Sequence, residues 1–290
     1  MLVRIWGCRG SLAAPGPDTL RYGGNTSCLE VRLSDGTLLV LDAGTGIRPL
    51  GLALDGARPA RIDVLLTHLH LDHLEGLGFF EPLWDPGTEL HIWGPPSPVR
   101  SLRQRIATYL SPPLFPVRLS EVPARLVLHD APDEPFRIGP ATVRAQPIVH
   151  RGPTVGYRVE EGGRVLAYLT DHEPALGVSI GTAPPEWVSG YGIAAGADLL
   201  IHDCQYTEQE YGPRMGWGHS STAHAAAFAR LAGYTPDTPT LERQLLRWLG
   251  LAEKIVANMN TAPARRMAAG RLRFLRSFAE QLQQELRLHR

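Results

Sequence analysis

The sequence predicts an α/β protein in which two mixed β-sheets pack face to face and helices cover both outer faces. Turn signals join strand-like runs into hairpins: Asp35-Gly36 lies between two such runs, and residues 160–163 lie between two others. Strands also interleave with helical stretches in both halves of the chain, and no repeat or linker divides it. We therefore expect a single domain over residues 1–290.

The first half of the chain is expected to alternate strands with short helices. Branched apolar runs predict strands at residues 2–6, 26–33, 38–41, 62–66, 89–93 and 125–129. Helices are predicted at residues 47–54, 74–80 and 98–110, and the prolines after Ser111 end the last of these.

The second half is expected to be rich in strands before it becomes helical. Strands are predicted at residues 140–149, 154–159, 165–170, 198–202 and 254–257. Helices are predicted at residues 223–231, in a helical insertion at 234–251, and in a long arginine-rich helix at 264–289. Pro263 suits the start of that last helix. The insertion could cover a site or bind a partner, and ordinary surface packing is the simpler reading.

The densest group of potential metal ligands follows the predicted strand at 62–66. Three histidines and an aspartate, His68, His70, Asp72 and His73, occupy six positions. His68 and His70 can point the same way while the chain is extended, whereas Asp72 and His73 follow where it turns and can diverge toward a second point. Imidazole and carboxylate ligands without a nearby cysteine suit zinc, manganese or iron. The alternative to a two-metal site is a polar loop of surface histidines.

Three more polar residues end strand-like runs: His150, Asp171 and Asp203. Functional loops gather at the carboxyl ends of strands in α/β proteins, so His150 and Asp171 are the expected remaining ligands. The two oxygens of Asp171 could bridge two metals. Other histidines near strands are expected to be structural, namely His91, His129, His172 and His202.

Two acids are expected to support the ligands from behind. Asp42 ends the run at 38–41 and precedes small residues that let the backbone approach a neighbouring loop, so it could orient a ligand imidazole. The alternative is an N-cap for the helix at 47–54, and the two roles can coexist. Asp203 is expected in the same supporting role.

His219 lies in a glycine-containing segment ahead of the helix at 223–231. It could bind a phosphate oxygen or protonate a leaving group. The alternative is that Ser220 or Ser221 caps the helix and His219 is merely exposed.

Composition is that of a soluble globular protein. Of the 290 residues 43% are hydrophobic and 20% charged, and 29 basic residues balance 29 acidic ones, so no overall field recruits nucleic acid or a membrane. Three scattered cysteines fit a reducing compartment. With neither a signal-peptide pattern nor a long apolar segment, the chain is expected to be cytoplasmic and unanchored.

The pattern His68-x-His70-x-Asp72-His73, with Asp42 before it and His150 and Asp171 after it, resembles the metallo-β-lactamase superfamily of binuclear metallohydrolases. Shorter segments are similar to the branch that contains tRNase Z and the cyclic phosphodiesterases of phosphonate breakdown: 7–11, 23–27, 168–171 and 218–221. The resemblance covers about residues 2–231. It implies an αββα sandwich in which His68, His70 and His150 hold one metal, Asp72 and His73 contribute to the other, and Asp171 bridges.

The chain departs from that resemblance near its end. The family supplies a last histidine to the second metal after its final strand, but here the run at 254–257 leads into Asn258, Met259 and Asn260. An amide oxygen of Asn258 or Asn260 could serve as a weak replacement ligand.

The leading functional hypothesis is a metal-dependent hydrolase that acts on a small-molecule or nucleotide phosphodiester through metal-activated water, with one or two zinc ions per chain. Asp72 and His219 are the expected catalytic residues. One rival is a degenerate, non-catalytic metal-binding or scaffold protein. Another is an RNA-processing nuclease, which would need a basic substrate-binding arm. No lysine-rich, glycine-rich arm is visible in the sequence, and the arginines of the helix at 264–289 are a weak substitute for it. That arginine stripe could equally be a solvated face or a homodimer surface.

Overall fold

We analysed a computed structural model, which describes residues 1–54, 56 and 58–233. Six strands form the first sheet in sequence order: β1 (Leu2–Gly7), β2 (Cys28–Arg32), β3 (Leu38–Leu41), β4 (Arg61–Leu65), β5 (Glu89–Gly94) and β6 (Arg125–Asp130). The first three strands pair antiparallel, and β3 to β6 pair parallel. The hairpin predicted around Asp35-Gly36 joins β2 to β3.

Five strands form the second sheet in the order β11-β10-β9-β8-β7. Their bounds are β7 (Phe136–Ile138), β8 (Ala141–Pro147), β9 (Val155–Glu161), β10 (Arg164–Leu169) and β11 (Leu199–His202). Among these five strands, β10 and β11 pair parallel and the other neighbours pair antiparallel. The predicted turn at 160–163 joins β9 to β10. β7 was not predicted, because three residues are too few to show an alternating pattern.

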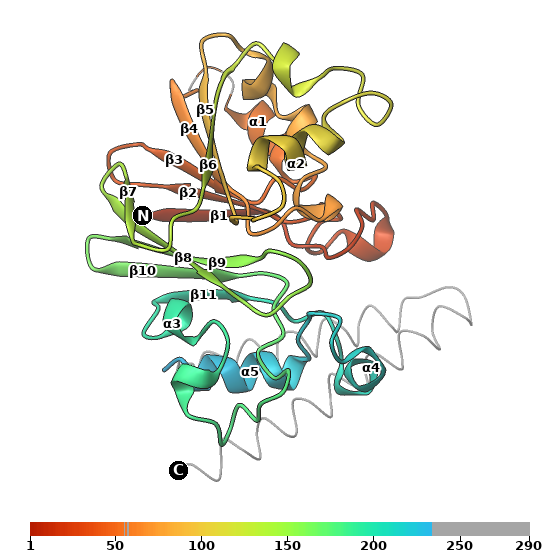
Figure 1. The fold of residues 1–290 in the computed structure, drawn as a ribbon, viewed down its shortest axis with the longest axis vertical. Helices are drawn as coiled ribbons and strands as arrows, with labels where there is room; N and C mark the ends of the chain where they lie inside the picture. Colours follow the sequence, from red (N-terminus) through yellow and green to blue (C-terminus); the bar gives the residue numbers. More distant parts are fainter. Residues whose placement is uncertain (55, 57, 234–290) are drawn as a thin grey trace. The chain divides into compact units, whose positions relative to one another are not determined.

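Three buried clusters define the layers. The first packs β4 and β5 residues such as Ile62 and Ile92 against helices α1 (Ile47–Ala53) and α2 (Leu102–Tyr109). The second lies between the sheets and joins Leu41 and Leu65 to Tyr157. The third packs β10 against α3 (Tyr191–Ala194) and α5 (Thr222–Leu231). Figure 1 shows the helices on the outer faces of the two sheets, so the predicted αββα sandwich is confirmed.

The remaining helices are short. They are α4 (Glu208–Tyr211) and the 3₁₀ turns Pro17–Thr19, Leu71–His73, Leu77–Phe79, Glu81–Trp84, Leu119–Glu121, Pro185–Trp187 and Gly212–Arg214. In the described part of the chain, no helix combines the length and the apolar character needed to cross a membrane.

The predicted helix at 74–80 is wrong, because this segment forms a turn followed by the 3₁₀ helix Leu77–Phe79 instead. The carbonyl oxygen of His73 accepts a hydrogen bond from Ala43 N–H at 2.8 Å, and Gly76 N–H donates to the Ala43 carbonyl at 2.9 Å. These bonds connect the segment to the turn after β3, and its internal bonds are short-range ones such as Leu77 N–H to the Leu74 carbonyl oxygen at 3.0 Å. Two glycines and the following Pro82 further weaken an α-helix here.

Several predictions lie outside the described residues. These are the insertion at 234–251, the strand at 254–257, the helix at 264–289, and the replacement ligands Asn258 and Asn260.

Candidate metal centre

The predicted ligands come from loops that follow strands of both sheets. The loop after β4 carries His68, His70, Asp72 and His73, while the loop after β10, in the other sheet, carries Asp171. His150 follows β8 of that second sheet. The carboxyl ends of β4 and β10, which belong to different sheets, thus lie at one edge of the sandwich, as expected for an α/β site.

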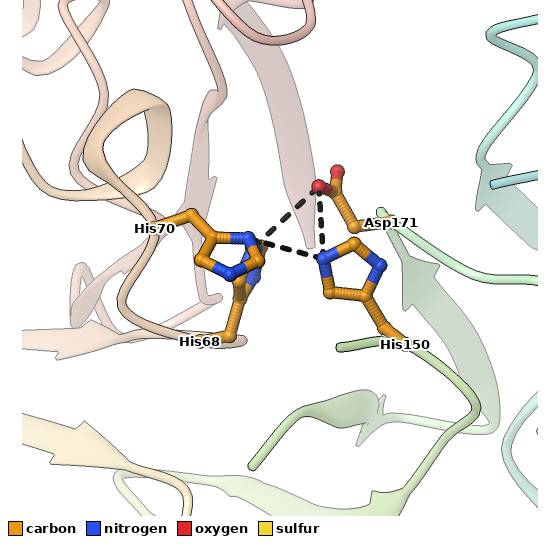
Figure 2. Close-up of side chains that lie close together, drawn as sticks. All are labelled: His68, His70, His150 and Asp171. Atoms are coloured by element: carbon orange, nitrogen blue, oxygen red, sulfur yellow. Dashed lines mark hydrogen bonds and ion pairs between the residues drawn. The ribbon is translucent and has the colours of Figure 1, made fainter. Parts of the chain in front are cut away.

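The first group of possible ligands comprises His68, His70, His150 and Asp171 (Figure 2). His70 Nδ1 lies 3.0 Å from His68 Nε2 and 3.1 Å from His150 Nε2. Asp171 Oδ2 lies 3.5 Å from His68 Nε2 and 3.6 Å from His150 Nε2. A tetrahedral zinc site with bonds of about 2.0–2.1 Å has ligand–ligand separations of roughly 3.3–3.4 Å. These four of the six ligand–ligand separations are close to that spacing, and all four ligand atoms lie within 4.8 Å of one another.

Hydrogen bonds behind this group orient its imidazoles. His150 Nδ1 donates to the carbonyl oxygen of Gly218 at 2.8 Å, so its Nε2 carries a lone pair. The Thr67 hydroxyl donates its proton to Asp42 at 2.9 Å. Because that proton is used, Thr67 Oγ1 accepts a hydrogen bond from His68 Nδ1 at 3.0 Å, and the Nε2 of His68 also carries a lone pair. Both Nε2 lone pairs consequently face the Asp171 carboxylate with no proton between them. A converging set of lone pairs suits a cation and would repel itself without one.

The second group comprises Asp72, His73 and Asp171. His73 Nε2 lies 3.1 Å from Asp171 Oδ1 and 3.5 Å from Asp72 Oδ2. Ser11 N–H donates to Asp72 Oδ2 at 2.7 Å and fixes this carboxylate from the N-terminal loop. Asp171 thus presents Oδ2 to the first group and Oδ1 to the second.

Asp42 holds the second group from behind. Its fully buried carboxylate accepts hydrogen bonds from His73 Nδ1 at 2.8 Å and from Thr67 N–H at 2.8 Å. The hydroxyl of Tyr168 also donates to it, at 3.1 Å. The alternative of a helix cap is wrong, because Gly46 occupies the N-cap of α1 and no side chain caps it.

The small residues after Asp42 let the backbone approach the neighbouring loop closely, as predicted. A Cβ at Gly44 would lie 2.3 Å from the carbonyl oxygen of Asp72, so only glycine fits. Within the described residues, the non-glycine positions with positive φ are Ser11, Asp42 and Asp171, at 67°, 61° and 49°. All three lie at this site. Such conformations persist where surrounding contacts enforce them, and they are concentrated at functional sites.

The surroundings shift the pKa values of the imidazoles in opposite directions in the two groups. Burial, reinforced by neighbouring histidines, lowers the pKa of His68 well below its ordinary value and also lowers that of His150, which keeps both neutral and able to ligate. For His73 burial acts in the same direction, but Asp42 and Asp171 outweigh it and raise the pKa. Burial opposes ionisation of Asp171, yet His73 and His68 lower the pKa of its carboxyl. The second group therefore attracts positive charge.

His219 faces the centre from the loop that precedes α5. Its Nδ1 donates to Asp203 Oδ2 at 2.8 Å, and its Nε2 lies 4.0 Å from Asp171 Oδ2. Burial disfavours its charged form, but Asp203 and Asp171 outweigh burial and raise the pKa of His219. Ser221 caps α5 through His224 N–H, as the alternative reading proposed, yet His219 is not thereby turned away from the centre.

A cavity of about 680 Å³ opens beside the second group. Its lining includes His73, Asp171 and Tyr168 together with Arg9 and Cys204. The lining thus combines candidate ligands with a cation from the N-terminal loop.

The histidines expected to be structural have protein partners. His172 Nδ1 lies 2.9 Å from His202 Nε2, and His91 Nδ1 lies 2.8 Å from His129 Nε2. Sequence reasoning missed Thr67, which precedes His68, and the buried Glu173, which follows Asp171 by two residues. Their place beside predicted ligands was the available signal.

Comparison with known families places the chain. A model of the beta-lactamase superfamily domain matches residues 37–236. The chain belongs to the metallo-β-lactamase superfamily. Of the curated superfamily relatives, ribonuclease Z of Haloarcula marismortui is 27% identical over 303 residues, covering 88% of this chain and 90% of the relative. Ribonuclease Z of Thermosynechococcus vestitus is 27% identical over 237 residues, covering 63% of this chain but only 56% of that relative.

Solved structures of the superfamily share the fold. The short form of human tRNase Z has a TM-score of 0.57 at 22% identity, covering 79% of this chain and 88% of that chain. The metallo-β-lactamase fold protein YhfI from Bacillus subtilis has a TM-score of 0.55 at 20% identity, covering 80% and 81%. A diphosphatase from the PhnP family has a TM-score of 0.54 at 18% identity, covering 79% and 80%.

Proposed function

We propose that this chain is a hydrolase that cleaves a phosphodiester at a metal centre held by His68, His70 and His150 on one side and Asp72 and His73 on the other. The observation that carries the proposal is the division of Asp171 between the two groups, with Oδ2 facing the first and Oδ1 facing the second. Cations held by the two groups would suit a substrate that carries negative charge on phosphate oxygens.

Zinc is the proposed metal, with one or two ions per chain, and manganese or iron as alternatives. Three imidazoles and a carboxylate whose ligand atoms lie within 4.8 Å of one another favour zinc in the first group. The second group has two carboxylates and one imidazole, a set that harder cations also accept. A bound divalent cation supplies Lewis acidity and lowers the pKa of water.

The chain's own residues then handle the protons. Asp72, held through Oδ2 by Ser11 N–H, takes a proton from the water whose oxygen attacks phosphorus. His219, whose pKa is raised by Asp203 against the effect of burial, binds a phosphate oxygen and gives the Nε2 proton to the leaving oxygen as the P–O bond breaks. Asp203 keeps the Nδ1–H of His219 directed away from the centre.

A small-molecule or nucleotide phosphodiester is the leading substrate. The relatives named ribonuclease Z favour a second form of the same chemistry, in which the phosphodiester belongs to RNA. Both substrates would present the same group to the centre. An RNA would contact more of the protein surface around the centre than a small phosphodiester would.

The test is hydrolysis of bis(4-nitrophenyl) phosphate by protein stripped of metal and reloaded with zinc or manganese. Asp171→Ala should lose nearly all activity, because it removes an oxygen from both groups. Asp130→Ala is the matched control, since Asp130 also ends a strand but lies on the exposed side of β6 beside Arg105. Equal rates for the wild type and Asp171→Ala would contradict the proposal.

Two further measurements separate the rivals. Zero or one tightly bound metal in a metal analysis, together with no turnover of phosphodiester, lactam or thioester substrates, would favour a non-catalytic metal-binding or scaffold protein. Cleavage of a structured precursor tRNA with higher kcat/KM than small phosphodiesters would favour the RNA-processing form.

A further inference from the structure

Glu173 is a fully buried carboxylate beside the proposed metal centre. It follows Asp171 by two residues, and its own N–H donates to the Val149 carbonyl oxygen at 2.9 Å. In the described part of the chain, Glu173 forms no ion pair with a basic side chain. A buried carboxylate is costly unless hydrogen bonds satisfy it, so its partners indicate what it does.

The partners of Glu173 belong to the segment that precedes His219. Oε1 accepts from Gly216 N–H at 2.8 Å, and Oε2 accepts from Gly218 N–H at 2.7 Å. The Tyr211 hydroxyl donates to Oε1 at 3.0 Å. Burial raises the pKa of Tyr211 to about 12, so this hydroxyl keeps its proton. One side chain thereby fixes two alternate amides of one loop.

The loop fixed by Glu173 contacts a proposed ligand directly. The carbonyl oxygen of Gly218 accepts the Nδ1–H of His150 at 2.8 Å. A Cβ on Gly218 would lie 2.3 Å from His150 Nδ1, so the backbone is packed against the ring. The next residue is His219, which approaches Asp171 from the same loop.

We infer that Glu173 is a positioning residue of the centre, which sets the imidazole orientation of His150 and the place of His219 through the loop Gly216–Gly218. The inference rests on the proposed metal-dependent function and adds to it a residue that touches neither metal nor substrate. Groups that orient a ligand in this way typically change metal affinity about 10- to 100-fold when replaced.

The test compares Glu173→Gln with Glu161→Gln in the full chain. Glutamine keeps the shape but turns an NH₂ toward one of the two backbone N–H groups, so that the loop must shift. Glu161 is a matched control: it is 8% exposed and also accepts a backbone N–H, from Ser34 at 2.8 Å. It lies six residues beyond Val155 on β9, about 20 Å along the strand from the end nearest the centre.

The probes are Zn²⁺, titrated in competition with a chromogenic chelator, and Co²⁺, whose visible absorption reports its coordination. Glu173→Gln should weaken the first-group zinc site about 10- to 100-fold, alter the Co²⁺ spectrum, and lower kcat with little change in KM. Glu161→Gln should leave the zinc affinity, the Co²⁺ spectrum and kcat unchanged, even if both variants melt at similarly reduced temperatures.

Equal zinc affinity in Glu173→Gln and the wild type would overturn the role of Glu173 and leave the proposed function standing. A wild type that binds no zinc would overturn both. Should Glu173→Gln be recovered unfolded, Tyr211→Phe decides the question, because it removes one of three donors and keeps the carboxylate. A several-fold loss of zinc affinity supports the inference, and wild-type affinity overturns it.

Discussion

His73 donates its Nδ1–H to Oδ2 of Asp42 across 2.8 Å, and this bond turns Nε2 toward Asp171 and Asp72. Asp42→Asn removes the charge that this imidazole and the Thr67 amide share. Zinc affinity of the second group should fall about 10- to 100-fold, measured by chelator competition. Asp63→Asn serves as control, because Asp63 is equally buried but pairs with Arg61 on β4. Unchanged affinity in Asp42→Asn would show that His73 needs no such support.

Replacement of His219 should slow the chemical step and leave metal binding intact. His219→Gln removes the imidazole whose Nε2 faces Asp171, and general acids of this kind contribute about 10²- to 10⁴-fold to rates. Steady-state kinetics on the aryl phosphodiester, with zinc content measured in parallel, checks this. His129→Gln is the control, since His129 pairs with His91 on the first sheet. If zinc is lost along with activity, His219 is a ligand rather than an acid.

Gly218 and Gly216 offer a matched pair of substitutions. Both have positive φ, at 91° and 81°, so alanine strains the backbone at either position. Only at Gly218 does the new Cβ meet His150, because nothing lies within 4 Å of the corresponding position at Gly216. Gly218→Ala should therefore lower zinc affinity and kcat at least tenfold more than Gly216→Ala does. Similar losses in the two variants would mean that backbone strain alone accounts for them.

Acid should weaken the contribution of Glu161 to stability. Hydrogen bonds from Ser34, first from its backbone N–H, lower the pKa of Glu161 in the folded chain. A group with a lowered folded pKa stabilises the fold above its unfolded pKa, about 4.3 for glutamate, and loses that contribution as the pH falls through the folded pKa. The unfolding midpoint of Glu161→Gln should lie below that of the wild type at pH 7, and the difference should shrink below about pH 4.3. Chemical denaturation followed by circular dichroism from pH 7 to 3 measures it, and a constant difference would be inconsistent with the shift.

Most strands could be predicted because each combines a branched apolar run with a turn signal, as in β3 and the hairpins around Asp35-Gly36 and residues 160–163. The helix expected at 74–80 failed because long-range backbone bonds from Ala43 decide that segment, and periodicity reports only local preference.

The ligands themselves were predictable because they crowd one strand end, but the groups that orient them were only partly so. Asp42 and Asp203 stood out as acids at strand ends. Thr67 and Glu173 did not, since their roles depend on partners 25 and 43 to 45 positions away in sequence.

Because the candidate ligands are divided between loops of opposite sheets, cation binding is thermodynamically linked to the association of those sheets. A peptide spanning β4 and the loop after it carries His68, His70, Asp72 and His73 but lacks the shared carboxylate of Asp171. It should bind zinc far more weakly than the folded chain. Zinc uptake during refolding would accordingly report the moment at which the two halves of the sandwich come together.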